Sequence, residues 1–341
     1  MILVNSSWGS WLAELGVLGL PFPEECGGYG GGPVETLIVM QAIGCGLLVE
    51  PYLATVVLGG GLVQALGDAQ QKRLLSQVAE GELTLAFAHG EPRARYALSQ
   101  VESRAEREGD GWKLTGRKAV VLHGAQADKL IVSARTAGSA GDEAGISLFV
   151  VDRGAAGLSV RDARTIDGLR AAEVKLKGVS VGPGMLLGPE GGAYAAIERV
   201  TDAGTAALCS EAVGVMDVLN AQTLDYLKAR QQFGQPIGRF QALQHRAVDM
   251  FIHCEQSRSI AMLAAMKAGD AEAMTSRQAV SAAKVHIGRS GRFISQAAIQ
   301  LHGGMGVTNE LPAAHYAKRL TMIDFWLGDA AHHLERFSRA A

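Results

Sequence analysis

Hydrophobic residues in the first 82 positions recur at helical spacing. Apolar residues that fall three or four positions apart at the start are Trp8, Trp11, Leu12, Leu15 and Leu18. This spacing places side chains on one face of a helix. Further helices are predicted over residues 34–48, 55–66 and 70–81. We therefore expect an N-terminal helical domain over residues 1–82.

From residue 83 to about 190 the pattern changes to short runs rich in valine, isoleucine and leucine. Turn residues such as Gly109-Asp110-Gly111 separate these runs. Strands are predicted over residues 112–116, 118–122, 129–134, 146–152 and 174–181, the first two as neighbours. Short strands at this spacing favour a small β-barrel or sandwich. Residues 83–190 therefore form a predicted middle β domain.

The remainder of the chain, residues 191–341, is rich in alanine and again has helical periodicity. Long helices are predicted over residues 194–229, 240–268, 271–302 and 311–337. Four long helices in succession are typical of a four-helix bundle. The overall prediction is an α+β multidomain protein.

Composition narrows the possible functions. Net charge is -2 with no basic block, so nucleic acid is not an expected partner. The apolar stretch 44–66 contains Glu50, Pro51 and three glycines, so it is not expected to span a membrane. The four cysteines form no CxxC pair, which favours reduced thiols in the cytoplasm. Three histidines near the end, His315, His332 and His333, invite a metal interpretation, but we expect no metal.

Two C-terminal segments carry a specific pattern. The first begins at Arg230 and reads RQQFGQPIG, and the second begins at Gln300 and reads QLHGGMG. Together they resemble the two C-terminal signatures of acyl-CoA dehydrogenases. Weaker matches near Trp11 and Lys118 extend the resemblance over nearly the whole chain, although we expect the family's usual first helix to be missing. The chain also resembles a narrower group, the short subunits of heteromeric enzymes such as the small subunit of pimeloyl-CoA dehydrogenase.

The resemblance implies that FAD is shared across a subunit interface. In such enzymes the middle domain of one subunit holds the flavin ring, and the bundle of its neighbour holds the pyrophosphate and adenosine. The residues that match this second half are Arg230, Phe233, Gln241, Gln300, Gly303 and Gly304. Arg230 would pair with a phosphate oxygen, Phe233 would pack near the adenosine, and the glutamines would donate amide hydrogen bonds. The two glycines would allow close backbone approach.

The same resemblance reveals departures from the family. Val120 and Leu122 stand where members carry an aromatic residue and a threonine that contact the flavin ring. Gly90 replaces a further threonine. The two usual positions of the catalytic glutamate fall on Leu327 and Gly204, and neither residue accepts a proton.

We therefore expect a non-catalytic small subunit in an α2β2 complex. A catalytic large subunit would supply the base and the ring site, an acyl-CoA would be the substrate, and electron-transferring flavoprotein would accept the electrons. One alternative is an autonomous homo-oligomeric dehydrogenase whose base is relocated to Asp324, Asp329 or Glu211. For the two aspartates, helix capping or an ion pair with Arg319 or Lys318 is the simpler interpretation. A second alternative is a structural subunit that no longer contacts flavin.

Overall fold

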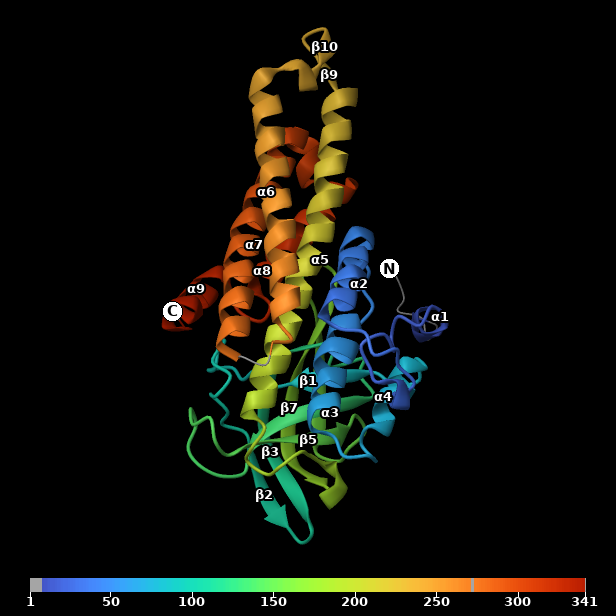
Figure 1. Ribbon diagram of the computed structural model, residues 1–341, viewed down its shortest axis with the longest axis vertical. Coiled ribbons are helices and arrows are strands. Elements are labelled where there is room, and N and C mark those ends of the chain that lie inside the picture. The colour runs from blue at the N-terminus through green and yellow to red at the C-terminus, as the bar shows by residue number, and fades with distance from the viewer. Residues whose placement is uncertain (1–7, 271–272, 341) are drawn as a thin grey trace. The chain divides into compact units, whose positions relative to one another are not determined.

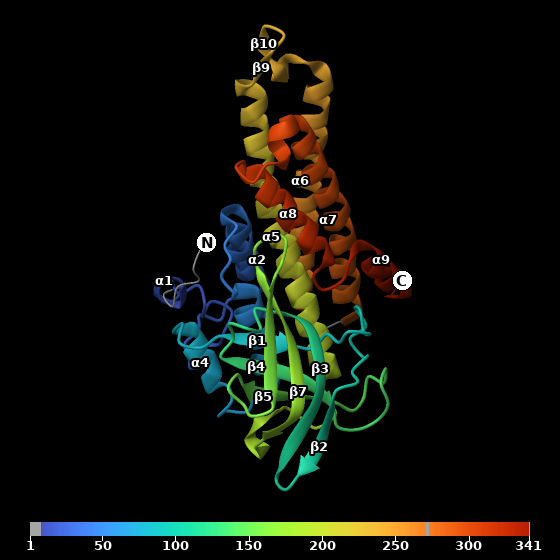
Figure 2. The ribbon, with the colours of Figure 1, turned by 180° about the vertical axis from the view of Figure 1, so that it is seen from behind.

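The computed structural model describes residues 8–270 and 273–340, which form two compact units (Figures 1 and 2). A sheet unit contains the chain up to Gly32 together with Val49–Gly204. A bundle unit contains Pro33–Leu48 together with the chain from Thr205 onward. The boundaries 1–82, 83–190 and 191–341 stay a prediction, drawn from pattern and not from contacts.

The sheet unit is built on a single eight-stranded sheet. Its strands are β1 (Leu85–Ala88), β2 (Arg104–Glu108), β3 (Gly111–Leu122), β4 (Lys129–Arg135), β5 (Ile146–Asp152), β6 (Leu158–Arg164), β7 (Arg170–Val181) and β8 (Leu186–Leu187). The strand order is β6-β7-β3-β2-β4-β5-β8, and β1 pairs in parallel with β4. The sheet confirms that the middle of the chain is a β domain.

The core of the sheet unit consists of inward-facing apolar side chains. Trp112 on β3 meets Phe149 on β5 edge to face, with ring centroids 5.5 Å apart. Both side chains are buried, as are Leu130 on β4 and Val174 on β7. Edge-to-face packing of two buried aromatic rings contributes about 1 kcal/mol beyond their burial. This cluster therefore fixes the central strands relative to one another.

The strands predicted over 112–116 and 118–122 are in fact one strand. Strand β3 continues through Gly116 and Arg117, and its pairing with β7 shifts register at two places instead of ending. A β-bulge absorbs an extra residue without ending a strand, and a turn would end it. The prediction of two neighbouring strands was wrong for this reason.

The helices of the sheet unit are short. They are α1 (Trp8–Glu14), α3 (Gly61–Leu66) and α4 (Arg73–Ala79), with a 3-10 turn at Glu24–Cys26 and a π-helix at Leu53–Gly60. The π-helix replaces the first part of the helix predicted over 55–66. Its buried Thr55 hydroxyl donates to the carbonyl of Leu85 at 3.0 Å, and this contact ties it to β1.

The bundle unit contains the long helices. These are α2 (Pro33–Gly46), α5 (Tyr194–Ala229, of which the part from Thr205 lies in this unit), α6 (Gln241–Lys267), α7 (Ala273–His302), α8 (Pro312–Phe325) and α9 (Ala330–Ala340). Two-residue strands β9 (Gln231–Gln232) and β10 (Gln235–Pro236) join α5 to α6. No helix among the described residues is long and apolar enough to cross a membrane.

Helices α2 and α5 approach each other through two glycines. A Cβ atom on Gly44 would lie 2.1 Å from the carbonyl oxygen of Glu211, and one on Gly214 would lie 2.1 Å from that of Gln41. Real Cβ atoms do not come this close to a backbone, so only glycine fits at either position. The contact packs α2 directly against α5 within the bundle unit.

The helix predicted over 311–337 is split in two. Helix α8 ends at Phe325 and α9 begins at Ala330. Between them Leu327 and Gly328 have φ angles of 58° and 112°, in the left-handed region that no helix continues through. Asp329 then accepts a hydrogen bond from the backbone N–H of His332 at 2.8 Å, as a helix N-cap does.

Candidate functional site

Arg230 begins a tight hairpin at the end of the bundle where α5 meets α6 (Figures 1 and 2). Its backbone N–H donates to the carbonyl of Tyr226 at 2.8 Å, and its own carbonyl accepts from Ile237 at 2.8 Å. These bonds fix the backbone on both sides of the hairpin. The Arg230 side chain itself is exposed.

Phe233 lies at the tip of this hairpin, with an uncommon backbone conformation and an exposed side chain. Strands β9 and β10 pair through Gln232 and Gln235, so the connecting loop is Phe233-Gly234. Both loop residues have positive φ, 54° and 78°, as a two-residue turn of this kind requires. A left-handed phenylalanine is uncommon, and this side chain is also 91% exposed. Neither burial nor backbone preference explains the residue, so it is a candidate for binding.

The structure brings the two signature segments to the same end of the bundle. The ring of Tyr226, one turn before Arg230, packs against His302 at the end of α7, with centroids 4.5 Å apart. Gly303 and Gly304 follow His302 directly. The sequence predicted both segments separately, and the Tyr226–His302 contact joins them.

Four of the predicted residues near these segments are open to solvent. Gln241 begins α6, Gln300 lies in the last turn of α7, and both side chains are exposed. A Cβ atom added to Gly303 or Gly304 would meet nothing within 4 Å. The φ of Gly303 is 62°, so glycine is favoured there even without a neighbour. The two glycines therefore leave open space for an external ligand.

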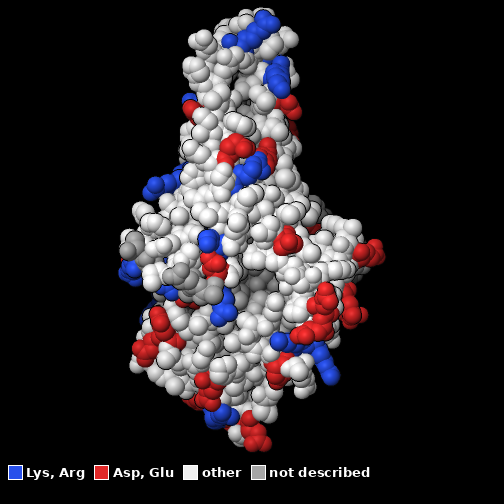
Figure 3. Space-filling view, viewed as in Figure 1, with Lys and Arg blue, Asp and Glu red and all other residues white. Residues whose placement is uncertain are grey.

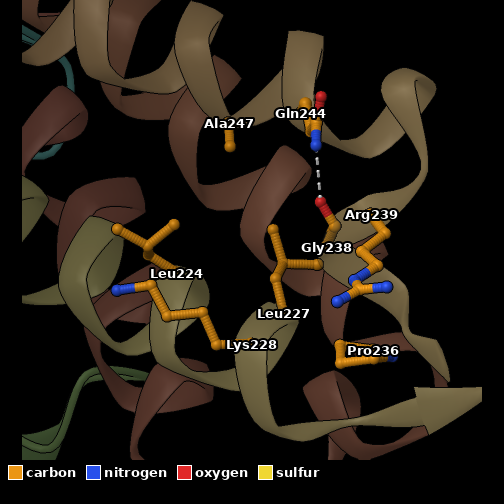
Figure 4. A pocket seen from close by; sticks show the side chains of 8 residues that line it. All are labelled: Leu224, Leu227, Lys228, Pro236, Gly238, Arg239, Gln244 and Ala247. Carbon is orange, nitrogen blue, oxygen red and sulfur yellow. Dashed lines mark hydrogen bonds between the residues drawn. The ribbon is translucent and has the colours of Figure 1, made fainter.

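A pocket of about 410 Å³ lies beside the hairpin, between the end of α5 and the start of α6 (Figure 4). Leu224, Leu227 and Ala247 give it an apolar lining, and Lys228 and Arg239 add two cations. The Gln244 side chain closes one side by donating to the carbonyl of Gly238 at 2.9 Å. The sequence analysis missed this pocket, although Lys228 and Arg239 flank the first signature on either side.

The connection between α8 and α9 is held from inside by Lys284 of α7. Its buried ammonium group donates to carbonyls of Ile323, Asp324, Trp326 and Gly328 at 2.5–2.9 Å. Burial lowers the pKa of Lys284 to about 8. Nε2 of His333 also donates to this region, to the carbonyl of Leu327 at 3.0 Å. The orphan carbonyls at the end of α8 are thus satisfied by one lysine.

A buried polar cluster lies under β3 in the sheet unit. The Lys118 ammonium donates to Glu91 at 2.6 Å and to Ser133 at 3.0 Å. The Ser133 hydroxyl is also 2.9 Å from Nδ1 of His89. Burial lowers the pKa of Lys118 to about 8, and burial together with Lys118 lowers that of His89 to about 3. Burial alone would raise the pKa of Glu91, but Lys118 and backbone N–H donors lower it.

Models of three acyl-CoA dehydrogenase domains match this chain in order. The N-terminal domain matches residues 8–82, the middle domain residues 86–179, and the C-terminal domain residues 190–341. The chain belongs to the acyl-CoA dehydrogenase family. It is therefore related to oxidoreductases, and a solved structure described as an FAD-dependent dehydrogenase is 26% identical to it with a TM-score of 0.91, over 99% of this chain and 93% of that chain.

Individual relatives match over almost the whole chain. The probable acyl-CoA dehydrogenase YngJ of Bacillus subtilis (strain 168) is 28% identical over 95% of this chain and 86% of its own. The solved "Tcur3481-Tcur3483 steroid ACAD G363A variant" is 31% identical with a TM-score of 0.87, over 99% of this chain and 88% of that chain. The ChsE4-ChsE5 complex from Mycobacterium tuberculosis is 27% identical with a TM-score of 0.85, over 96% and 86%.

Leu327 and Gly204, the positions predicted to correspond to the family's glutamates, have no side chain that accepts a proton. Leu327 lies in the α8–α9 connection, with its backbone in the left-handed region. Gly204 lies within α5 and has no side chain. The correspondence of both positions to the family's glutamates stays a prediction.

The three acidic residues that could replace the base have structural contacts. Glu211 is buried, and its two oxygens accept from the Arg319 guanidinium at 2.5 and 2.8 Å. Asp329 caps α9, as the simpler interpretation proposed. Asp324 is also buried, but its cationic neighbour is Arg292 at 3.6 Å. The predicted partners were wrong for Asp324, because Arg319 is held by Glu211 and Lys318 bonds to Asn309.

The sequence resemblance predicts that the flavin ring would lie against β3, and this stays a prediction. In this chain Val120 is 63% exposed and has a φ of 55°, at the bulge where β3 shifts its pairing with β7. Leu122, two residues on, is buried. Val120 offers a small aliphatic surface in place of an aromatic ring, and Leu122 offers no hydroxyl.

The histidines considered as metal ligands have other contacts. His315 lies 3.1 Å from the carbonyl of Asn309, and His333 contacts Ser281 and Leu327. Of the described residues, Asp217, Cys254 and Glu255 lie close enough to share an ion. The Arg258 guanidinium contacts both carboxylates, at 2.6 and 3.3 Å, and so takes the place of a cation.

Proposed function

We propose that this chain is the non-catalytic small subunit of a heteromeric acyl-CoA dehydrogenase. Its hairpin end would complete an FAD site whose ring half and base belong to a catalytic large subunit. The complex would form the α,β-double bond of an acyl-CoA and pass the electrons to an electron-transferring flavoprotein. Two relatives of known structure, Tcur3481-Tcur3483 and ChsE4-ChsE5, are named as pairs of chains, which supports a heteromeric assembly.

One observation carries the proposal. Arg230 and Phe233 are exposed at the tip of the bundle, beside two glycines with open space around them. In contrast, the usual base position is a leucine, and the possible substitute Glu211 is held by Arg319. The residues expected to bind the FAD of a neighbouring subunit are therefore present, and a carboxylate at the expected base position is missing.

The residues at the hairpin fit the pyrophosphate and adenosine half of FAD. The Arg230 guanidinium is suited to a phosphate oxygen, and exposed Gln241 and Gln300 can donate amide hydrogen bonds. The Phe233 ring meets Phe240 at right angles, with centroids 6.0 Å apart, and is otherwise exposed, so it offers aromatic surface for packing. When bound, FAD supplies the acceptor for the β-hydride. This chain would contribute binding and orientation, and the partner's carboxylate would take the α-proton.

The main rival is an autonomous dehydrogenase with a relocated base. Asp324 is its best candidate, because one carboxylate oxygen of this buried residue has no hydrogen-bond partner. The Arg292 guanidinium, however, already lies 3.6 Å from the Asp324 carboxylate and pairs with it. The other rival, a subunit that no longer contacts flavin, leaves the strained and exposed Phe233 unexplained.

The visible spectrum of the purified chain tests the proposal. Alone, the chain is expected to be colourless. Co-expressed with its catalytic partner, it is expected to give a yellow complex that an acyl-CoA bleaches without oxygen. A yellow lone chain that acyl-CoA bleaches would instead support the autonomous enzyme, and Asp324→Asn would then be the variant to examine.

Arg230→Ala distinguishes a subunit that helps to bind FAD from a structural subunit that no longer contacts flavin. Losing a charge-assisted hydrogen bond costs about 1.5–3 kcal/mol, so FAD should bind the complex roughly tenfold to a hundredfold more weakly. The matched control is Arg153→Ala, an exposed arginine of the sheet unit, which should leave flavin content unchanged. Equal flavin content in both variants would favour the structural subunit.

A further inference from the structure

Strand β6 lies at one edge of the eight-stranded sheet. It pairs with β7 along its whole length, and no second strand among the described residues pairs with its other side. An open edge can accept a further strand, and proteins often guard such edges with a proline, a bulge or a very short strand. Strand β6 has none of these three, because it is seven residues long, contains no proline and pairs without a register shift.

The backbone groups of β6 that point away from β7 follow from the hydrogen bonds at its two ends. The N–H of Lys177 donates to the carbonyl of Gly157 at 3.0 Å, and the N–H of Thr165 donates to the carbonyl of Leu169 at 3.0 Å. In an antiparallel pair every second residue bonds to the neighbouring strand, and the residues between them direct their N–H and C=O groups to the other side. The residues of β6 with outward N–H groups in this phase are Val160, Asp162 and Arg164.

The side chains of β6 alternate between two different faces of the sheet. On one face Leu158 and Val160 pack against the core of the sheet unit. Further along this face Asp162 accepts from Arg170 at 3.1 Å, so the apolar part is the half that begins at Leu158. The opposite face is exposed and carries Ser159, Arg161 and Ala163.

The exposed face around Arg161 is basic. Its cross-strand neighbour Glu173 is shared by three cations, Arg161 and Arg117 at 2.6 Å and Lys175 at 3.6 Å. Lys177, two residues further along β7, adds a fourth cation. Arg117 and Lys175 are also direct cross-strand neighbours, and like charges in that relation destabilise a sheet. Over much of the face seen in Figure 3, by contrast, acidic and basic side chains lie in mixed groups.

Charge decides which strand can be added to this edge. If two copies of β6 paired about Arg161, the middle residue of the strand, the two guanidinium groups would lie directly opposite each other. The basic face therefore guards the edge against a second copy of this chain. A strand with carboxylates on that face would instead pair with Arg161, within the field of Lys175 and Arg117. Apolar residues on its other face would extend the packing of Leu158 and Val160.

From this geometry we infer that the open edge of β6 binds an extended segment of a partner protein in which acidic and apolar residues alternate. The segment adds to the sheet as a further strand. Hydrogen bonds to the outward backbone groups supply affinity, and Arg161 selects the acidic face. The inference goes beyond the proposed function and does not depend on it, because β6 belongs to the sheet unit and the Arg230 hairpin to the bundle unit.

The first test measures binding of a labelled synthetic heptapeptide to the full chain by fluorescence anisotropy. The probe alternates glutamate and valine and begins and ends with glutamate, so that as a strand it has one acidic and one apolar face. The control peptide has the same composition, with all glutamates first and all valines last. We expect the alternating peptide to bind about tenfold more tightly or better. Equal binding of the two peptides, or binding of neither, overturns the inference.

Variants of the chain separate the contribution of charge from that of the backbone. Arg161→Glu should weaken binding of the alternating peptide by about tenfold or more. Arg73→Glu, at an exposed site on α4, is the matched control and should leave binding unchanged. Val160→Pro removes an outward N–H and keeps the ladder with β7, so it should bind roughly threefold to tenfold more weakly than Val160→Ala. Equal binding by the two Val160 variants would mean that charge alone holds the peptide, and strand addition would be wrong.

Discussion

The hairpin end of the bundle and the α8–α9 connection differ in how many of their groups have a contact within the chain. At the connection, one buried lysine donates to four carbonyls and His333 contacts a fifth. At the hairpin, Arg230 and Phe233 extend into solvent, and Phe233 does so in a strained conformation. The backbone carbonyls of the connection have partners within the chain, whereas the side chains of Arg230 and Phe233 are exposed. We therefore expect this chain to bind a ligand at the hairpin.

The largest expected effect is at the connection. Lys284→Met removes every ammonium donor to the carbonyls that end α8 and leaves those carbonyls buried without partners. The expected loss is about 3 kcal/mol in the free energy of unfolding, measured by urea denaturation. Lys267→Met, on the exposed end of α6, should change it by less than about 0.5 kcal/mol. If the two variants are equally stable, the connection is not held by Lys284.

A second effect should appear in acid, at the buried cluster of the sheet unit. The folded pKa of His89, about 3, lies below its ordinary value of 6.5. Between these values the unfolded chain takes up a proton that the folded chain does not, so stability falls as pH falls. The slope is up to about 1.4 kcal/mol per pH unit.

His89→Leu should flatten this dependence between pH 6 and 4, measured as urea denaturation at each pH. His333, whose pKa is also lowered to about 3 by burial, would supply part of the slope that remains. Parallel curves for the wild type and His89→Leu would show that His89 does not cause the acid sensitivity.

The smallest effect should be a gain in stability at the hairpin. Phe233→Gly removes a side chain that is 91% exposed and relieves a left-handed backbone, which should stabilise the chain by about 1 kcal/mol. The same change should weaken FAD binding in the complex, because the aromatic face is lost. Phe233→Ala is the control that removes the ring and keeps the strain. A destabilised Phe233→Gly would mean that the hairpin is already complete within the chain.

Long periodic elements were predicted well from the sequence. Helix α5 runs from Tyr194 to Ala229 and strand β5 from Ile146 to Asp152, as their patterns indicated. Strand β2 was missed because its sequence, RAERE, is charged and mostly exposed at the edge of the core. Its place follows from pairing with distant strands, which no local pattern contains.

The site was predicted in pieces. Both signatures were visible in the sequence, but their contact through Tyr226 and His302 depends on how α5 and α7 pack. The end of α8 was missed although Gly328 and Asp329 are ordinary signals for a helix stop and a new start. Leu327, which precedes Gly328 and has a left-handed backbone, accepts a hydrogen bond from His333 that sequence periodicity does not report.

The glycine contact between α2 and α5 has a consequence for synthesis on the ribosome. Gly44 and Gly214 belong to one compact unit, yet residues 49–204 are made between its two parts. At 5–20 residues per second, the α2 segment emerges roughly ten to thirty seconds before α5 follows. During that interval its glycine face has no helix to pack on, while the sheet unit can already assemble. Helix α2 is therefore synthesised before the rest of the bundle unit and can pack on α5 only after α5 has been made.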